Sequence, residues 1–347
     1  MIRILTVAAI AFGLWLPVQA GAVVDGTPAD ISDYPYFTVV GTGCGGALIA
    51  PRRVLTAAHC LEALYESDKV RVGPDRIQRR IVLRAILPLH FRELQKMQRE
   101  FPPPAGDLML LALNRPVRGI APARIATPAQ QLTAPGTIVT TIGRGATGSD
   151  GAGQGVFRSG SVQVQAPARC ADEISTPLLR NWSLCVRDPR MDDPEDPGPF
   201  VSACFGDSGG PLLADGGQGN RIIGVVSWGP SCGEQRDPEI YANAIRGREF
   251  ALRKNPVWAP QTIGRPRVIG RTRVGQTVRC RVRWRQRPTR KLAFSFILDG
   301  LQVQSSRRAT YRIRGADRGK KISCDGQGET AGGRGGSLQL APVRVVR

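Results

Sequence analysis

Three short motifs, spaced along the chain, constrain its fold more than any other feature of the sequence. Residues 56–60 read Thr-Ala-Ala-His-Cys, residues 107–111 read Asp-Leu-Met-Leu-Leu, and residues 204–211 read Cys-Phe-Gly-Asp-Ser-Gly-Gly-Pro. The order His, Asp, Ser is one of three unrelated chain orders that build the same hydrolytic triad. A working triad requires a fold that brings residues as distant as 59 and 208 into contact.

These motifs resemble those of the chymotrypsin-like (trypsin-fold) serine proteases over roughly residues 23–252. The resemblance is specific because several independent motifs, including the later Ser227-Trp228-Gly229, occur in the right order. It implies an all-β fold of two antiparallel six-stranded barrels with the active site between them. Short apolar runs such as Tyr36–Val40 and Ile222–Ser227, bounded by Gly, Pro and polar turns, also favour β-strands.

The resemblance implies a catalytic role for one residue of each motif. Ser208 is the expected nucleophile, and its hydroxyl needs an adjacent base to react at neutral pH. His59 is the expected base, and Asp107 is expected to hold its imidazole in the right tautomer. The backbone N–H groups of Gly206 and Ser208 are the expected oxyanion hole. His90, the only other histidine, is expected to lie in a surface loop.

Five residues are expected to contact the substrate. In the family, the segment Ser227-Trp228-Gly229 pairs with the substrate backbone as an added strand. Ser202 stands at the pocket floor, where trypsin-like members carry Asp, and Glu239 stands where glycine usually lines the pocket wall. The Glu239 carboxylate either receives a basic substrate side chain or turns away to solvent. We expect cleavage after Lys or Arg and also after larger apolar or aromatic residues.

The N-terminus has the pattern of a secretory signal peptide over residues 1–22. Arg3 precedes an apolar run, and two small-residue sites follow, which allow cleavage after Ala20 or Ala22. The apolar run is too short for a membrane span, and no other run approaches the required length of roughly 18 residues. The sequence therefore predicts a secreted or periplasmic protein without a transmembrane segment.

The residues after this leader, Val23-Val24-Asp25-Gly26, resemble the mature N-terminus of the family. The resemblance implies that the free amine of Val23 pairs with Asp207. A buried carboxylate without a charged partner is costly, so this pair is expected to hold the oxyanion loop in shape.

Eight cysteines in an exported chain favour disulfides, although their spacing does not determine the pairs. The family resemblance implies the pairs Cys44–Cys60, Cys170–Cys185 and Cys204–Cys232. Cys280 and Cys324, outside the protease region, are left to pair with each other. No metal-ligand cluster, phosphate loop or flavin motif is recognisable, so neither a metal nor a cofactor is expected.

The chain carries a net charge of +20, and most of it lies at the C-terminus. Residues 262–347 contain 21 Arg and Lys against 4 Asp and Glu, which gives +17. This asymmetry predicts a protease domain over residues 23–254, a linker over 255–261 and a basic module over 262–347.

The basic module has a β pattern of its own. Every odd position of Arg279–Arg287 is Arg, and this alternation predicts a strand with one arginine-bearing face. Asp317-Arg318-Gly319 before Cys324 is similar to the late cysteine-bearing strand of bacterial immunoglobulin-like (Ig-like) sandwiches. Phe294 and Phe296 are candidates for the aromatic that covers the disulfide.

The sequence thus predicts an exported serine endopeptidase that acts on protein or peptide substrates as a monomer.

 A single chain would then combine a hydrolytic domain with a basic module that targets it to anionic surfaces, such as an anionic polysaccharide or nucleic acid. The alternative is an envelope polyanion-binding protein whose protease-like domain is secondary or inactive. A further alternative is that the arginine row is only a solvated face.

Overall fold

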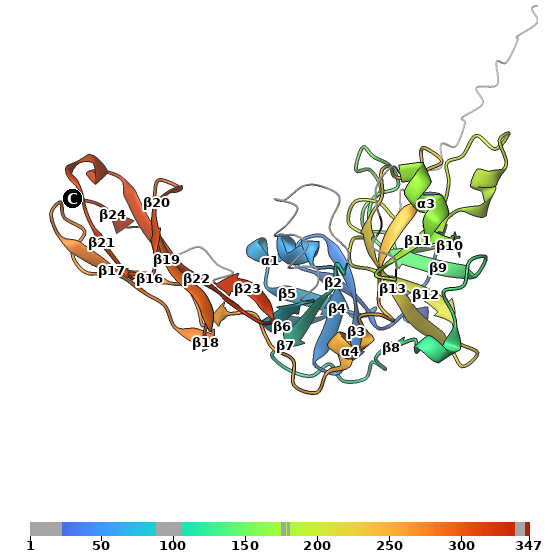
Figure 1. Cartoon of the computed structure of the whole chain (residues 1–347), viewed down its shortest axis with the longest axis horizontal. Coiled ribbons are helices and arrows are strands. Elements are labelled where there is room, and N and C mark those ends of the chain that lie inside the picture. The colour runs from blue at the N-terminus through green and yellow to red at the C-terminus, as the bar shows by residue number, and fades with distance from the viewer. Residues whose placement is uncertain (1–22, 88–105, 175–177, 179–180, 337–343) are drawn as a thin grey trace, which may run out of the picture.

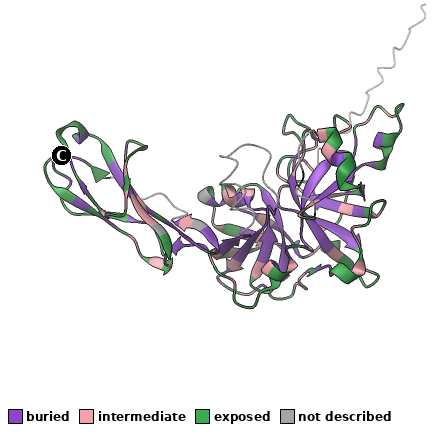
Figure 2. Ribbon diagram, viewed as in Figure 1, coloured by how far each residue is buried: buried purple, intermediate pink, exposed green. Residues whose placement is uncertain are grey.

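The computed structural model describes residues 23–87, 106–174, 178, 181–336 and 344–347, so the expected signal peptide and His90 lie outside the described residues. Three all-β bodies lie in a row along the long axis of the molecule (Figure 1). The C-terminal module is at one end, the first barrel is in the middle and the second barrel is at the other end. Buried residues fill the two barrels, whereas much of the module is exposed (Figure 2).

The first barrel is a closed ring of six strands in the order β2-β3-β4-β7-β6-β5, with antiparallel neighbours. Successive residues of a strand point to opposite faces, so each strand supplies every second side chain to the barrel interior. The strands are β2 (Phe37–Val40), β3 (Cys44–Ala50), β4 (Arg53–Thr56), β5 (Lys69–Val72), β6 (Ile77–Ile86) and β7 (Met109–Leu113).

The second barrel closes because β10 pairs with both β9 and β11, so that six antiparallel strands follow one another around the ring. Together the two rings confirm the prediction of two six-stranded barrels. The strands are β9 (Ile138–Gly143), β10 (Arg158–Val164), β11 (Ser183–Arg187), β14 (Glu239–Asn243), β13 (Asn220–Trp228) and β12 (Pro211–Asp215), and β1 (Thr27–Pro28) and β8 (Arg124–Ile125) add to β10 and β13.

The helices of the described residues are short and lie between strands. Arg53 of β4 donates hydrogen bonds to the carbonyls of Arg253 and Lys254, just after the helix that closes the protease region. The elements are η1 (Ile31–Asp33), η2 (His59–Leu61), α1 (Ala63–Glu66), η3 (Pro128–Gln130), α3 (Pro167–Ile174), η4 (Pro189–Asp192), α4 (Arg248–Leu252) and η5 (Gly315–Asp317).

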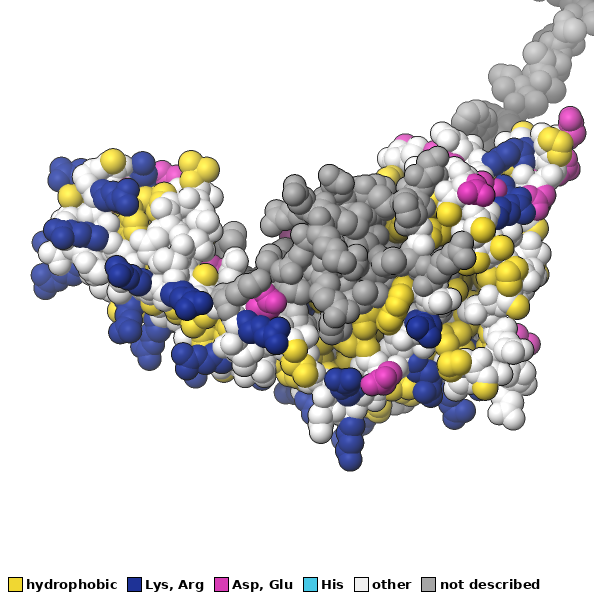
Figure 3. Space-filling model, viewed as in Figure 1, with side chains coloured by type: hydrophobic (Ala, Val, Ile, Leu, Met, Phe, Trp, Pro, Cys, Tyr) yellow, Lys and Arg dark blue, Asp and Glu magenta, His cyan; other side chains and the backbone are white. Residues whose placement is uncertain are grey.

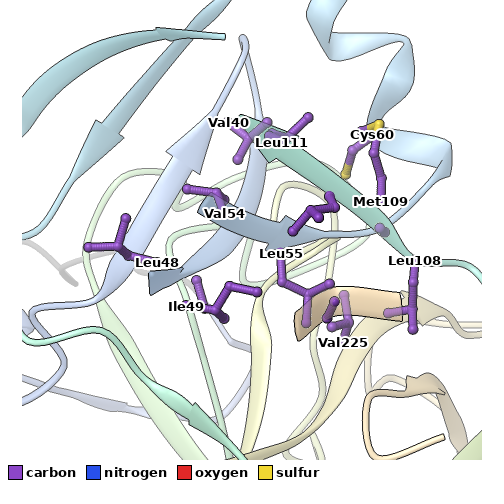
Figure 4. Close-up of a cluster of buried hydrophobic side chains, with 14 of the residues drawn as sticks. Val40, Leu48, Ile49, Val54, Leu55, Cys60, Leu108, Met109, Leu111 and Val225 are labelled. Atoms are coloured by element: carbon purple, nitrogen blue, oxygen red, sulfur yellow. The ribbon is translucent and has the colours of Figure 1, made fainter. Parts of the chain in front are cut away.

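The two barrels share one apolar core. Leu55 of β4 and Leu108, just before β7, are fully buried in the same cluster as Val225 of β13, and Figure 4 shows the three side chains close together. Asp107 immediately precedes Leu108, so this shared core positions the start of β7 at the boundary between the barrels.

The C-terminal module consists of two sheets around a smaller core. The disulfide Cys280–Cys324 joins β17 of one sheet to β22 of the other, and Phe296 lies in the core between them. The smaller sheet has the order β16-β17-β21, and the larger one the order β18-β15-β23-β22-β19-β20 with β24 added to β22. The bounds are β15 (Gln261–Thr262), β16 (Arg267–Ile269), β17 (Thr277–Arg281), β18 (Trp284–Gln286), β19 (Arg290–Leu298), β20 (Leu301–Ser306), β21 (Thr310–Arg312), β22 (Lys321–Thr330), β23 (Gly333–Gly336) and β24 (Arg344–Val345).

The predicted single arginine strand is wrong in its extent. Arg279 and Arg281 are exposed on β17, but β17 ends at Arg281, and Arg285 lies on β18 in the other sheet. The alternation of residues is a local pattern, whereas the crossing of the chain from one sheet to the other depends on which strand edges are available for pairing.

Backbone hydrogen bonds attach the module to the first barrel. The N–H of Ala259 donates to the carbonyl of Arg84 at 2.7 Å, and the N–H of Ile86 donates to the carbonyl of Gly332 at 3.1 Å. Arg84 itself is almost fully buried, and Gln261 of β15 pairs with Gly336 of β23. The end of the expected linker is therefore part of the module's sheet and is packed against β6.

Candidate active site

His59 and Asp107 are held together at the boundary between the barrels. Nδ1 of His59 lies 2.7 Å from Oδ2 of Asp107, and the backbone N–H of His59 donates to Oδ1 at 2.9 Å. The Asp107 side chain is buried, while the His59 side chain remains 30% exposed. This geometry orients the imidazole and leaves its far edge accessible, as a general base requires.

Two opposing effects act on the pKa of His59. Burial lowers it, and the negative charge of Asp107, its hydrogen bond and the charge of Glu62 raise it, so that the pKa lies above the usual 6.5. The protonated form of the His59 imidazole is therefore stabilised by Asp107.

Ser227 makes a contact that the sequence motif did not indicate. Its hydroxyl donates to Oδ2 of Asp107 at 2.7 Å in a buried environment. Ser227 was expected only to pair with the substrate backbone. The only sequence signal for this contact was the position of Ser227 directly before Trp228 and Gly229 in a recognised motif. The contact itself joins residues 120 positions apart, and local patterns do not indicate such pairs.

Ser208 lies on a turn whose backbone is tied to the first barrel. Its carbonyl accepts a hydrogen bond from the N–H of Gly45 at 2.7 Å. The residue before Gly45 is Cys44, which forms a disulfide with Cys60, the residue after His59. A side chain at Gly209 would lie 2.2 Å from Oγ1 of Thr56, so glycine is required for this close approach. The turn of Ser208 and the segment of His59 are therefore both attached to the start of β3.

The expected oxyanion hole lies in the same turn. Gly206 has a φ of +97°, a conformation that L side chains rarely adopt. The N–H groups of Gly206 and Ser208 make no hydrogen bond to other groups in the described part of the chain. Both are therefore free to donate to a substrate oxygen.

Asp207 is fully buried beside the start of the described chain. Its carboxylate accepts hydrogen bonds from the N–H groups of Cys204 at 3.0 Å and Gly145 at 2.6 Å, and the N–H of Val23 lies 3.4 Å from Oδ2. Burial raises the pKa of Asp207 to about 6 although these donors lower it. The structure thus brings Val23 and Asp207 together.

The expected pocket residues also lie together. Ser202 and Glu239 are both buried, and a Cβ placed on Gly229 would lie 3.7 Å from Cγ of Glu239. Trp228 pairs with Ile240, the residue after Glu239, so the substrate-pairing segment borders this wall. The Glu239 side chain does not turn away to solvent.

The environment of Glu239 favours its neutral form. Its Oε2 accepts a hydrogen bond from the hydroxyl of Tyr241 at 2.7 Å, and that hydroxyl is also 3.0 Å from Oγ1 of Thr141. Burial raises the pKa of Glu239 to about 7, although hydrogen bonds from Ser202, Tyr241 and the backbone of Ala203 lower it. A cation placed beside this carboxylate would favour its ionised form.

All eight cysteines form disulfides. Three are the pairs that the family resemblance implies, Cys44–Cys60, Cys170–Cys185 and Cys204–Cys232, and the fourth joins the two remaining cysteines, Cys280 and Cys324. Within the described ranges, the one group with the spacing of a metal site is Cys44, His59 and Cys60. Its two sulfurs are bonded to each other, so they are not thiolate ligands. Of the helices that the structure describes, none has the length and apolarity needed to cross a membrane.

Comparisons with known proteins agree with this geometry. The Trypsin family model matches residues 23–250. The chain is 31% identical to human Kallikrein-7 over 234 residues, which cover 66% of this chain and 85% of that protein. It is 28% identical to a trypsin from Saccharopolyspora erythraea, over 63% of this chain and 92% of that protein. A trypsin from Phaedon cochleariae is 27% identical, over 66% of this chain and 86% of that protein.

Proposed function

Because the chain belongs to the trypsin family and is a trypsin-like serine endopeptidase, we propose that His59, Asp107 and Ser208 are its catalytic triad. The observation that carries this proposal is the pair of hydrogen bonds from the backbone and the imidazole of His59 to buried Asp107. Ser208 then supplies the nucleophile on a turn tied to the same segment.

The reaction passes through an acyl-enzyme. Oγ of Ser208 attacks the carbonyl carbon of the substrate while Nε2 of His59 takes the hydroxyl proton. The N–H groups of Gly206 and Ser208 donate to the oxyanion of the tetrahedral intermediate. The C–N bond then breaks, and His59 gives its proton to the leaving amine. Water attacks the ester by the same steps and releases the acid product.

The substrate site follows from the buried pocket residues. Segment 227–229 pairs with the substrate backbone, and Ser202 and Glu239 lie where the substrate side chain enters. The neutral Glu239 accepts an apolar or aromatic side chain, and a bound Lys or Arg draws it into the ionised form. This arrangement supports a mixed preference at the cleaved bond.

Export and removal of the N-terminal leader produce the mature protease. Four disulfides are typical of oxidising compartments outside the cytoplasm, which supports a secreted or periplasmic location. Removal of the leader would expose the amine of Val23 next to Asp207. The ion pair between this amine and the carboxylate of Asp207 would then hold the turn that contains Gly206 and Ser208.

The basic module is proposed to be an Ig-like relative that targets a monomeric protease to anionic surfaces. Its two sheets are joined by Cys280–Cys324, and Phe296 packs between them. Its +17 charge attracts polyanions of any kind.

Ser208→Ala tests the catalytic proposal. Peptide hydrolysis by the purified, processed protein should fall by several orders of magnitude, because loss of the nucleophile in subtilisin lowers turnover by about 10⁶. Labelling with a serine-directed fluorophosphonate should be lost as well. Ser161→Ala, on an exposed position of β10, is the matched control. A wild-type protein that neither hydrolyses peptides nor takes the label would support the polyanion-binding alternative instead.

A further inference from the structure

One face of the C-terminal module is covered by arginines. In the sheet β16-β17-β21, the exposed positions include Arg267, Arg279, Arg281 and Arg312, and we call these four the arginine face. Arg267 lies directly opposite Arg281 in the ladder. Like charges in such cross-strand pairs destabilise a sheet, so the module carries an unfavourable arrangement on this face.

A groove adjoins the arginine face at β21. It has a volume of about 610 Å³ and presents hydrogen-bond donors from hydroxyl and guanidinium groups, whereas the amide of Gln304 donates to Ser306 and to the carbonyl of Thr310. No carboxylate lines it. The lining residues are Thr277, Gln304, Ser306, Arg307, Arg308, Thr310 and Arg312.

The guanidinium groups of this region have no acidic partners within the described residues. Neither the arginine face nor Arg307 and Arg308 takes part in any ion pair there. This contrasts with the second barrel, where Arg190 pairs with both Asp25 and Asp188. The charge of the face is therefore available to an external anion. Figure 3 shows Lys and Arg side chains over the visible side of the module with few acidic ones among them.

We infer that the groove and the arginine face together bind the phosphate backbone of duplex nucleic acid. The inference rests on the proposal that the module binds polyanions and names the site and the ligand. Guanidinium groups match phosphate oxygens in a bidentate manner, and the hydroxyls of Thr277 and Thr310 add donors.

The spacing of the arginines favours a duplex. Alternate residues of a strand are separated by about 6.6 Å, so Arg279 and Arg281 present charges at this interval. The phosphates of one strand of a DNA duplex rise by about 3.4 Å each along the axis, so the interval between these two arginines corresponds to two phosphate steps when β17 lies along that axis. The exposed residues of the three strands include no aromatic side chain on which a base could stack, which argues against a single strand and favours contacts to the backbone of a duplex.

The test compares two triple variants of the full-length processed protein that lose the same charge. One replaces Arg307, Arg308 and Arg312 of the groove by Ser, and the control replaces Arg283, Arg285 and Arg287 by Ser. The control residues are exposed but lie around β18, in the other sheet. Binding to a fluorescent 30-base-pair DNA duplex is measured as a function of salt, with heparin as a second probe, and thermal unfolding confirms that each variant is folded.

The groove variant should bind the duplex at least about tenfold more weakly, and its salt slope should fall by about 2 to 3, since each lost phosphate contact removes about 0.9. The control variant should change affinity less than about threefold, as expected for charges remote from the site. Equal losses in both variants would overturn the site but leave polyanion binding intact. Binding of heparin without binding of DNA would overturn the choice of nucleic acid. Binding of neither probe would overturn the proposed role of the module as well.

Discussion

The carboxylate of Glu239 accepts a hydrogen bond from the hydroxyl of Tyr241 at 2.7 Å, and both side chains are buried in the second barrel. The contact keeps Glu239 in the wall of the expected pocket next to Gly229. Because burial raises the pKa of Glu239 to about 7, this carboxyl exchanges its proton near neutral pH.

Glu239→Gln should lower kcat/KM for cleavage after Lys or Arg by at least about tenfold, since a hydrogen bond to a charged group contributes about 1.5–3 kcal/mol. Cleavage after Phe or Leu should change much less, because a neutral Glu239 and a Gln present similar groups to an apolar side chain. Glu249→Gln, which removes an exposed carboxylate on α4, is the control. Equal losses for both substrate classes in a library of peptides would contradict this role of Glu239.

The preference for the residue before the cleaved bond should also vary with pH in the wild-type enzyme. Glu239 has a raised pKa, so it is protonated below about 7 and ionised above it. The ratio of cleavage after Lys to cleavage after Phe should therefore rise as the pH increases from 6 to 8, and the ratio should become flat in Glu239→Gln. A ratio that is flat in the wild type would show that the carboxylate does not face the substrate.

Ser227→Ala should shift the acid limb of the kcat/KM profile to higher pH. The lost hydroxyl leaves the negative charge of Asp107 less compensated, so Asp107 attracts the imidazolium of His59 more strongly and raises its pKa further above 6.5. A purely structural role of Ser227 would lower activity at every pH without moving the limb. Ser161→Ala should leave the profile unchanged.

Processing at Val23 should change how stability depends on pH. In a form that retains Gly21 and Ala22, Asp207 has a folded pKa of about 6, above its usual 3.8, so stability falls as the pH rises from about 4 to 6. A free ammonium at Val23 lowers the pKa of Asp207 and thereby removes this loss of stability with rising pH. Thermal unfolding of both forms between pH 4 and 8 measures the difference, and full activity of the form that starts at Gly21 would contradict the pairing.

Gly335→Ala should weaken the attachment of the module to the first barrel. A Cβ at Gly335 would lie 2.1 Å from the carbonyl oxygen of Pro260 and 3.0 Å from Nη2 of Arg84 in β6, so the backbone must shift where the module meets the barrel, at a cost of about 1–3 kcal/mol. Gly315→Ala is the control, because nothing lies within 4 Å of its Cβ position. Calorimetry should show a lower unfolding temperature for Gly335→Ala alone, and equal temperatures for the two variants would contradict a packed interface.

The sequence by itself determined the features that are local in the chain. The motifs around His59, Asp107 and Ser208 predict the family and its two barrels, and the excess of Arg after Thr262 predicts a separate basic module. Glycines such as Gly209 mark turns that are recognisable because they require a residue without a side chain.

Only the tertiary structure decided which distant groups meet. The hydroxyl of Ser227 reaches Asp107, Tyr241 holds Glu239, and the backbone of Arg84 accepts a bond from Ala259. Alternation along a strand specifies which side chains share a face, but strand order and register arise from pairing and packing between segments far apart in the chain. For that reason the arginine row of the sequence is divided between two sheets, and the arginine face draws its members from three strands.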